Sequence, residues 1–280
     1  MDLSIIIVNY NTQELTKSCV ESVRKNTKSI DYEIILVDNA SVDGSAEFFS
    51  SMEGIIFIQS GGNIGFGCAN NLGFTYSSGR YILMLNSDTI VENDILSRMV
   101  RCFDSLPEDV GCIGSLLVHA DRQPSFSFGY YITWREEFGK KVAKRDSTTI
   151  DNEQKEVEYL SGADLFVRRN LVERIGLFDP DFFMYYEDME LGYRYKKAGY
   201  RSLVIKDYGI IHLEGASSKS SFKKICIITR SYLLYLRKTL PYREYCMARF
   251  CIAIRRFLTV WHYRWSLKDS LSYIKILIKS

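Results

Sequence analysis

The alternation of short apolar runs with segments of helical periodicity constrains this sequence most. The runs at 3–9, 32–38, 54–59 and 81–86 read LSIIIVN, YEIILVD, GIIFIQ and YILMLN. Continuous apolar runs of this length are typical of strands that are covered on both faces. Between the first two runs, Leu15 and Cys19 recur at helical spacing. Alternating strands and helices predict an α/β fold with a mainly parallel sheet flanked by helices.

An Asn or Asp residue follows four of the predicted strands in turn. Asn9, Asp38, Asn63 and Asp88 occupy these positions. Turns favour both residue types, so one such placement carries little information. Ligands of open α/β sheets lie beyond the carboxyl ends of the strands, however, and four placements in series indicate a shared cleft there.

Charge is distributed unevenly along the 280 residues, although the net charge is only +2. Residues 219–280 contain 14 Lys or Arg and 2 Asp or Glu, a net of +12, which leaves −10 for residues 1–218. This shift predicts a main domain over 1–218 and a basic helical extension over 219–280. Residues 119–156 show no clear period and are interpreted as a long irregular insertion.

The extension combines basic and aromatic residues in two predicted amphipathic helices. Such helices suit an anionic membrane surface. The alternative is that both helices pack on the main domain and expose a solvated basic face, and the two interpretations are compatible. Nucleic acid also fits the charge, but no recognised motif supports that partner. The apolar positions are Phe222, Ile225, Cys226, Thr229, Leu233 and Leu236 in the first helix, and Met247, Phe250, Ile254, Phe257, Leu258 and Trp261 in the second.

The location expected from the sequence is cytoplasmic. The chain begins without a basic, signal-like segment, and no apolar run approaches the roughly 20 residues that span a bilayer. The seven cysteines lack CxxC pairs, which is typical of reduced cysteines. Any membrane contact would then be peripheral, at the inner face of the cell membrane.

Asp88 and His212 are candidate ligands for a divalent metal ion, because each ends an apolar run. Mg²⁺ and Mn²⁺ prefer oxygen ligands, and a nucleoside diphosphate supplies several of them, so one or two protein ligands suffice. Mn²⁺ also accepts imidazole. Taken alone, Asp88 is equally well a turn or capping residue, and His212 a structural histidine.

Glu187, Asp188 and Glu190 begin a predicted helix, where the helix dipole favours carboxylates in any case. The preceding segment, FDPDFFMYY, is rich in aromatic residues and would place a carboxylate in a partly dry setting. A general base needs such a setting. Glu187 and Asp188 cannot face the same way on a helix, so only one of them can be the base.

The glycine-rich stretch SGGNIGFGCANNLG at 60–73 is a weak phosphate-binding signal. It lacks the Lys of a Walker loop and the GxGxxG spacing. Its small residues would still let a ligand approach the backbone, and Asn63 and Asn70 add hydrogen-bonding groups.

Seven motifs in order, from about residue 3 to residue 218, resemble the family 2 inverting glycosyltransferases of the GT-A fold. The residues of these motifs are most similar to those of the bacterial rhamnosyltransferase branch of that family. The motifs are SIIIVNYNT, EIILVDNASVDGS, GGNIGFGCANNLG, YILMLNSDT, SGADLFVRR, GLFDPDFFMYYEDMELGYRYKKAGY and IIHLEGAS.

This resemblance implies roles on the donor side. Residues 86–88, Asn-Ser-Asp, occupy the DxD position of the family, with Asn in place of the first Asp, and the last Asp is expected to reach the metal. His212 matches the late metal-ligand histidine, so the expected cofactor is Mg²⁺ or Mn²⁺. The implied nucleotide-sugar-binding residues are Asn9, Tyr10, Asp38, Asn63, Asn70, Asn86, Ser87 and Asp88.

The same resemblance implies roles on the acceptor side. Asp188 matches the catalytic base, and Gly162, Ala163, Asp164 and Glu187 match the segments that lie against the acceptor. The acceptor hydroxyl would lose its proton to Asp188 and attack the anomeric carbon in one displacement that inverts its configuration.

The function implied is transfer of a sugar from a nucleotide-diphospho-sugar donor to a glycan or a lipid-linked saccharide in bacterial cell-surface polysaccharide synthesis. The expected donor is dTDP-rhamnose. One alternative is a nucleotidyltransferase of related fold, but VNYNTQEL lacks the Gly-rich, basic loop that this activity needs after the first strand. The other is a non-catalytic subunit that binds a sugar nucleotide or a partner.

Overall fold

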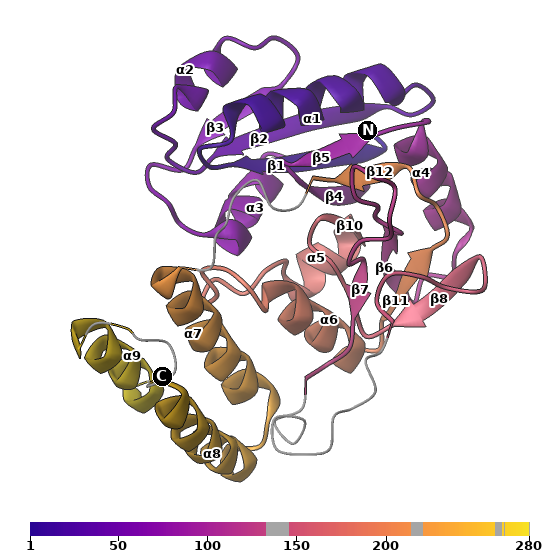
Figure 1. The fold of residues 1–280 in the computed structure, drawn as a ribbon. Coiled ribbons are helices and arrows are strands. Elements are labelled where there is room, and N and C mark those ends of the chain that lie inside the picture. Colours follow the sequence, from indigo (N-terminus) through magenta and orange to yellow (C-terminus); the bar gives the residue numbers. More distant parts are fainter. Residues whose placement is uncertain (133–145, 214–220, 261–264, 266, 280) are drawn as a thin grey trace.

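The structure is a computed structural model, which describes residues 1–132, 146–213, 221–260, 265 and 267–279. One sheet of eight strands forms the centre of this described part (Figure 1). Its strands, in order across the sheet, are β3 (Ile56–Gln59), β2 (Tyr32–Asp38), β1 (Leu3–Asn9), β4 (Tyr81–Asn86), β10 (Asp164–Arg168), β6 (Val110–Ser115), β11 (Arg201–Ile205) and β8 (Gln154–Val157).

All neighbouring pairs in the sheet are parallel except those that involve β10 or β8. The predicted α/β fold with a mainly parallel sheet is therefore confirmed. Because β10 runs against β4, its amino end lies beside the carboxyl end of β4, with Asp164 opposite Leu85. The reversed strand thus brings residues 162–164 to the edge of the sheet where a ligand is expected.

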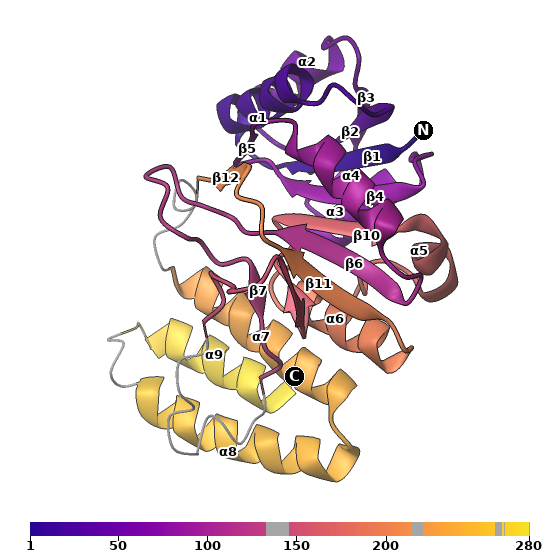
Figure 2. The same cartoon turned by 90° about the vertical axis from the view of Figure 1, so that its right-hand side faces the viewer.

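Helices cover both faces of the sheet, as Figure 2 shows from the side. Side chains alternate along each strand, so Ile5 and Ile7 join one buried cluster and Ile6 joins the other. The first cluster includes residues of α1 (Gln13–Asn26), α2 (Ser45–Ser50) and α4 (Ile95–Ser105), and the second includes residues of α3 (Phe66–Phe74), α5 (Arg169–Ile175) and α6 (Glu187–Lys197).

Two short two-stranded ribbons lie beside the main sheet. Strand β5 (Thr89–Val91) pairs antiparallel with β12 (Ile210–His212), and β7 (Phe128–Gly129) pairs antiparallel with β9 (Tyr159–Leu160). The segment 157–168 contains the end of β8, then β9 and β10, and the chain turns at residues 161–163 between β9 and β10.

Three C-terminal helices form a layer against α6: α7 (Phe222–Thr239), α8 (Tyr242–Val260) and α9 (Leu267–Lys279) (Figures 1 and 2). Lys238 contacts Asp179 and Asp181, each at 2.7 Å, and the Ser231 hydroxyl donates to the Met184 carbonyl at 2.7 Å. The layer thereby supports the segment that precedes α6. The predicted boundary between residues 218 and 219 lies outside the described residues and stays a prediction.

Helix α8 turns the predicted apolar face outward. Its buried residues are Tyr245, Ala248 and Ile252, whereas Met247 and Phe250 are exposed. For α7 the prediction is better, because Cys226, Thr229, Leu233 and Leu236 are buried and Phe222 and Ile225 are partly buried. Of the other residues of the second set, Ile254 is exposed, while the side chains of Phe257 and Leu258 and all of Trp261 lie outside the described residues.

Phe103 anchors α4 on the sheet. It is fully buried, its ring stacks on Tyr81 at 4.6 Å, and the Arg168 guanidinium lies 4.3 Å from its centroid. We predict that Phe103→Ala lowers the free energy of unfolding by about 3–5 kcal/mol, because a large cavity replaces a well-packed ring. Urea denaturation measures this loss. Tyr76→Ala, at a half-exposed aromatic residue, is the control, and losses of similar size in both variants would contradict the packing assigned to Phe103.

Candidate active site

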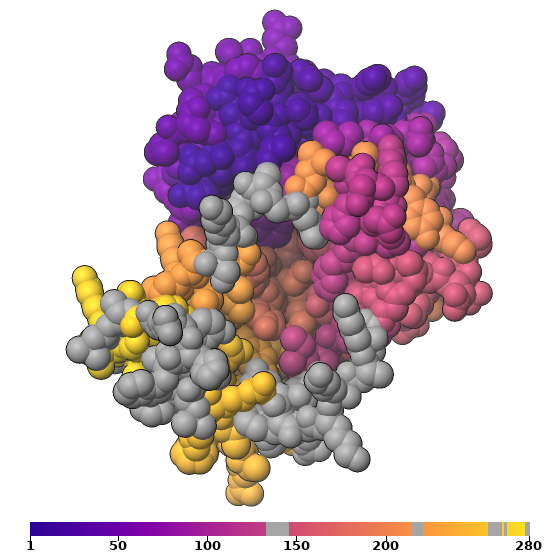
Figure 3. Space-filling view, in the orientation of Figure 1, coloured from indigo at the N-terminus to yellow at the C-terminus, as the bar shows by residue number. Residues whose placement is uncertain are grey.

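A pocket of about 730 Å³ opens at the edge of the sheet where the carboxyl end of β4 meets the amino end of β10. Figure 3 shows this region as a hollow between the N-terminal half and the C-terminal helices. Its lining residues come from parts of the chain far apart in sequence. They are Phe66, Asn86, Asp88, His119, Phe126, Ser161, Gly162, Ala163, Met184, Tyr185, Glu187, Asp188, His212 and Lys224.

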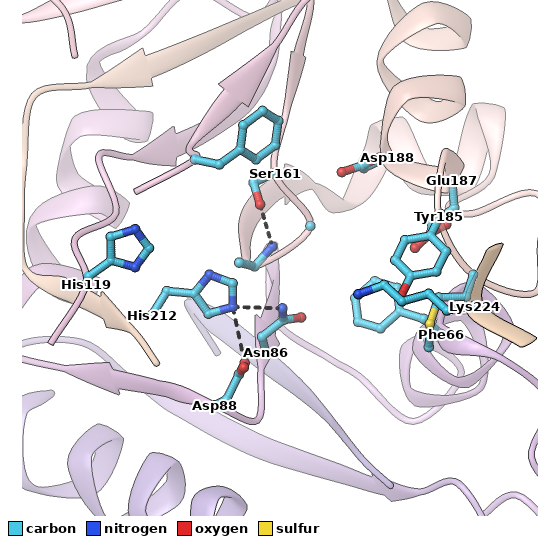
Figure 4. A pocket seen from close by; sticks show the side chains of 14 residues that line it. Phe66, Asn86, Asp88, His119, Ser161, Tyr185, Glu187, Asp188, His212 and Lys224 are labelled. Carbon is cyan, nitrogen blue, oxygen red and sulfur yellow. Dashed lines mark hydrogen bonds and ion pairs between the residues drawn. The ribbon is translucent and has the colours of Figure 1, made fainter. Parts of the chain in front are cut away.

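The β5–β12 ribbon brings Asp88 and His212 together at one end of the pocket. His212 pairs with Thr89, and the Leu213 N–H donates to the Asp88 carbonyl at 2.8 Å. As a result Asp88 Oδ1 lies 3.2 Å from His212 Nε2, and the Asn86 amide nitrogen lies 3.4 Å from the same ring atom (Figure 4).

These atoms fit a divalent cation. Two adjacent ligands of an octahedral ion at about 2.1 Å are about 3 Å apart, close to the spacing between Asp88 Oδ1 and His212 Nε2. Among the described residues, no three His, Cys, Asp or Glu side chains gather into a metal site. A cation here would therefore take two ligands from the protein and the others from a bound diphosphate and water.

Glu187 and Asp188 lie on the far side of the pocket from Asp88 and His212 (Figure 4). The two residues before them, Tyr185 and Tyr186, adopt left-handed conformations with φ of 71° and 68°. Such conformations are costly for residues with large side chains and are retained where the surroundings hold them. Tyr186 is held by stacking on Tyr232 of α7, with ring centroids 5.4 Å apart.

The carboxyl groups of Glu187 and Asp188 interact through their charges, and both pKa values are raised. Burial raises the pKa of both, and the charge on Asp188 raises the pKa of Glu187 further. Asp188 is the better site for the charge, because its Oδ1 accepts the Met189 N–H at 2.8 Å and the Gly162 N–H lowers its pKa. Glu187 Oε2 is buried without a hydrogen-bond partner among the described residues.

The segment 162–164 reaches the pocket, but the Asp164 side chain does not line it. Gly162 and Ala163 do line it, and the Ala163 carbonyl accepts the Asn86 N–H at 3.0 Å. The Asp164 carboxylate is buried beneath, where Oδ2 accepts the Ser115 N–H at 2.7 Å and its hydroxyl at 2.5 Å. The acceptor-binding role expected for Asp164 stays a prediction, and its contacts here are with the protein.

Asn9 and Asp38 form a buried network at the carboxyl ends of β1 and β2. The Asn9 amide donates to Asp38 Oδ1 at 2.8 Å, and the Ser41 N–H donates to Asp38 Oδ2 at 3.0 Å. The Thr12 hydroxyl donates to Asn9 Oδ1, and Thr12 makes no side-chain capping hydrogen bond to α1. Thr12 also lies 3.3 Å from the Ser87 hydroxyl, which links this network to residues 86–88.

Four residues predicted to bind the nucleotide sugar do not line the 730 Å³ pocket: Asn9, Asp38, Asn63 and Asn70. Asn63 accepts the Asn39 amide at 3.2 Å, and the Asn70 amide donates to the Phe66 carbonyl within α3. Ser87 and the half-exposed Tyr10 are also absent from its lining. Their nucleotide-binding roles stay predictions.

The glycine-rich stretch contributes to the site by close packing. Gly65 has φ of +86°, and a Cβ there would lie 2.2 Å from the Phe183 carbonyl oxygen. Phe66, the next residue, donates its N–H to that oxygen at 3.0 Å and lines the pocket. The Asn71 side chain donates to the Phe178 carbonyl and accepts the Phe178 N–H, at 2.7 and 3.0 Å. Helix α3 therefore fixes the segment that leads to Asp188.

Sequence reasoning missed several lining residues, of which His119 and Lys224 carry the most chemistry. His119 starts the segment that shows no period, and it lines the pocket beside His212 (Figure 4). Lys224 belongs to α7, and its Nζ lies 5.9 Å from the centre of the Tyr185 ring. Neither residue sits in a recognisable motif, and only the basic character of the extension pointed toward Lys224.

A comparison with known families identifies the chain. Residues 4–176, more than half of its length, match the Glycosyl transferase family 2 domain. The chain belongs to glycosyl transferase family 2, and it is therefore a transferase of the GT-A fold.

Two curated relatives and one solved structure are similar to the chain. The low-salt glycan biosynthesis hexosyltransferase Agl10 of Haloferax volcanii is 28% identical over 70% of this chain and 62% of its own length. The rhamnosyltransferase WbbL of Escherichia coli is 26% identical over 79% of this chain and 86% of its own. The crystal structure of GalNAc-T7 with UDP, GalNAc and Mn²⁺ superposes with a TM-score of 0.61 at 18% identity, over 85% of this chain and 48% of that one.

Asp164 makes the stability of the protein depend on pH. Burial raises its pKa to about 7, so the folded state resists ionisation between about pH 4 and pH 7. Stability contributed by the protonated form is complete below pH 4 and is lost as the pH rises through 7. Asp164→Asn changes the free energy of unfolding by a different amount at each pH. We predict that this change is more stabilising at pH 8 than at pH 4.5, by on the order of 3 kcal/mol.

Urea unfolding at both pH values measures this effect. Asp151→Asn, the same change at an exposed residue, should give no difference between the two pH values. An effect of Asp164→Asn that is the same at pH 4.5 and at pH 8 would show that the Asp164 carboxyl is not held protonated by burial.

Proposed function

We propose that this chain transfers a sugar from a nucleotide-diphospho-sugar to a hydroxyl of a glycan or a lipid-linked saccharide, in one displacement that inverts the anomeric centre. The observation that carries the proposal is the arrangement of the 730 Å³ pocket. A candidate metal pair, Asp88 and His212, lies at one end of it, and a partly buried carboxylate, Asp188, lies on the opposite side. One substrate can thus meet both groups.

Asp188 is the base in this proposal. Its charged form is held by the backbone N–H groups of Met189 and Gly162, and its raised pKa brings its basicity closer to the operating pH. As the acceptor oxygen attacks the anomeric carbon, Asp188 takes the hydroxyl proton and the bond to the diphosphate breaks. Glu187 keeps its proton and donates a hydrogen bond to the acceptor.

Asp88 and His212 would hold the Mg²⁺ or Mn²⁺ ion. When bound, such an ion supplies positive charge that stabilises the departing diphosphate. Asn86 contacts His212 through its amide and so positions the ring. The Mn²⁺ and UDP in the GalNAc-T7 structure support this assignment, because that fold holds both.

For the substrates, we infer a rhamnosyl donor, dTDP-rhamnose, and an acceptor of bacterial cell-surface polysaccharide synthesis. The similarity to the Escherichia coli rhamnosyltransferase, over most of both chains, supports this inference. A lipid-linked acceptor lies at a membrane, so the proposal includes peripheral association with the inner face of the cell membrane. The described residues contain no helix that is both long and apolar enough to cross a bilayer.

Replacement of the base tests the mechanism. We predict that Asp188→Asn lowers the turnover number for sugar transfer by roughly 10²–10⁴-fold, because the amide cannot accept the proton. Donor affinity, measured by calorimetry, should change little. Glu187→Gln is the matched control: an amide resembles a protonated Glu187, so most of the activity should remain. If Glu187→Gln were the more damaging change, the roles of the two residues would be reversed.

Replacement of a metal ligand tests the donor site. We predict that one of UDP, dTDP and GDP raises the melting temperature only when Mn²⁺ is present, and that Asp88→Ala removes the shift. A ligand at 100 times its dissociation constant stabilises the folded state by about 2.7 kcal/mol, which a thermal-shift assay detects. Asp151→Ala, at an exposed carboxylate, should keep the response. A shift that needs neither Mn²⁺ nor Asp88 would remove the metal from the proposal.

A further inference from the structure

Helix α8 has apolar residues on two faces. One face packs into the layer of C-terminal helices through Tyr245 and Ile252, which are 5% and 0% exposed. The other face carries Met247, Phe250 and Ile254, which are 57%, 67% and 47% exposed. These three residues follow at i, i+3 and i+7, so they form one stripe along the helix.

This outer stripe does not serve the folding of the chain. The inner face already gives α8 its packing partners, and burial of Met247 and Phe250 contributes little, because more than half of each is exposed. Isolated exposed apolar residues are ordinary, but an aligned stripe of large ones marks an interaction surface. Figures 1 and 2 agree that α8 lies on the side of the helical layer away from the sheet, where a partner can reach it.

The basic charge of the C-terminal helices selects the kind of partner. Arg243 and Arg255 on α8, and Lys268 and Lys275 on α9, are exposed. Residues 219–280 carry a net charge of +12. A second copy of the chain would bring the same positive charge to the contact and be repelled, whereas an anionic lipid surface attracts it. Apolar side chains flanked by basic ones are the pattern of helices that lie in a membrane interface.

We propose that the outer face of α8, defined by Met247, Phe250 and Ile254, docks onto an anionic bilayer and inserts these three side chains at the boundary of headgroups and acyl chains. This proposal rests on the proposed function in one respect: a lipid-linked acceptor gives the enzyme a reason to contact a membrane. The same helical layer lines the pocket, because Lys224 of α7 faces into it. Docking through this layer would hold the enzyme at the membrane that would carry a lipid-linked acceptor.

Vesicle flotation with the full chain tests this proposal. One set of vesicles contains equal parts of phosphatidylglycerol and phosphatidylcholine, and the other contains phosphatidylcholine alone. The unmodified chain should float with the anionic vesicles and not with the neutral ones, and added salt should weaken the binding. Met247→Ser with Phe250→Ser should lower the partition coefficient by roughly tenfold or more, because two large apolar side chains no longer insert.

A matched control removes two exposed apolar side chains from elsewhere on the surface. Val42→Ser with Tyr76→Ser changes residues that are 90% and 54% exposed and lie outside the C-terminal helices. This variant should float as the unmodified chain does. Equal binding by both double variants would overturn the assignment of the face, and failure of the unmodified chain to bind anionic vesicles would overturn the proposal.

Self-association and donor binding are measured on the same variants. Light scattering during size exclusion detects self-association, and a dimer that Met247→Ser with Phe250→Ser dissociates, without vesicle binding, would make the face an interface between copies and overturn the proposal. The thermal shift with nucleotide and Mn²⁺ should be the same in both double variants, since neither touches the pocket. If that shift fails in the unmodified chain while vesicle binding holds, the donor site is wrong and the docking face stands.

Discussion

The hydrogen bond from the Asn86 N–H to the Ala163 carbonyl joins the two halves of the pocket. It exists because β10 runs against β4, so the end of one strand meets the start of the other. In an all-parallel sheet, residues 162–164 would emerge at the opposite edge, far from Asp88. One reversed strand thus brings the segment that touches Asp188 to the segment that carries the candidate metal ligand.

A second constraint acts at the start of α6. The left-handed Tyr185 and Tyr186 cost free energy, and their neighbours hold them in place. Tyr232 of α7 stacks on Tyr186, and the Ser231 hydroxyl holds the Met184 carbonyl. The C-terminal helices therefore do more than extend the chain, because they stabilise the backbone that presents Glu187 and Asp188 to the pocket.

The sequence predicted those parts that depend on local period and strand ends. The first four parallel strands, the helix at Glu187 and the proximity of Asp88 to the sheet edge follow from apolar runs and the residues after them. The strand ends named Asp88 and His212 as candidate ligands but left a structural role open for each, because the ribbon that joins them spans 124 positions of sequence, and the family resemblance then supported the pair. The sequence could not predict which face of α8 is exposed, since both faces of this helix carry apolar residues.

The burial of polar side chains could likewise not be predicted from the sequence. Asp164 and Asn70 belong to motifs that resemble a substrate site, yet both side chains bond to the protein, and their neighbours Ala163 and Asn71 make the contacts that shape the pocket. Adjacent residues point in different directions on helices as well as on strands, and motif spacing alone does not say which of them a ligand meets. Lys224 reaches the pocket from a helix that follows the main domain, which only tertiary packing reveals.

The stereochemistry of transfer shows whether Asp188 acts as a base toward the acceptor. The anomeric configuration of the first product, followed by NMR from the start of the reaction, distinguishes one displacement from two. We expect inversion relative to the donor, because in the proposed mechanism Asp188 accepts the acceptor proton and forms no bond to the sugar. Retention of configuration would contradict it, since the sugar would then pass through a second displacement for which Asp188 has no role as a base.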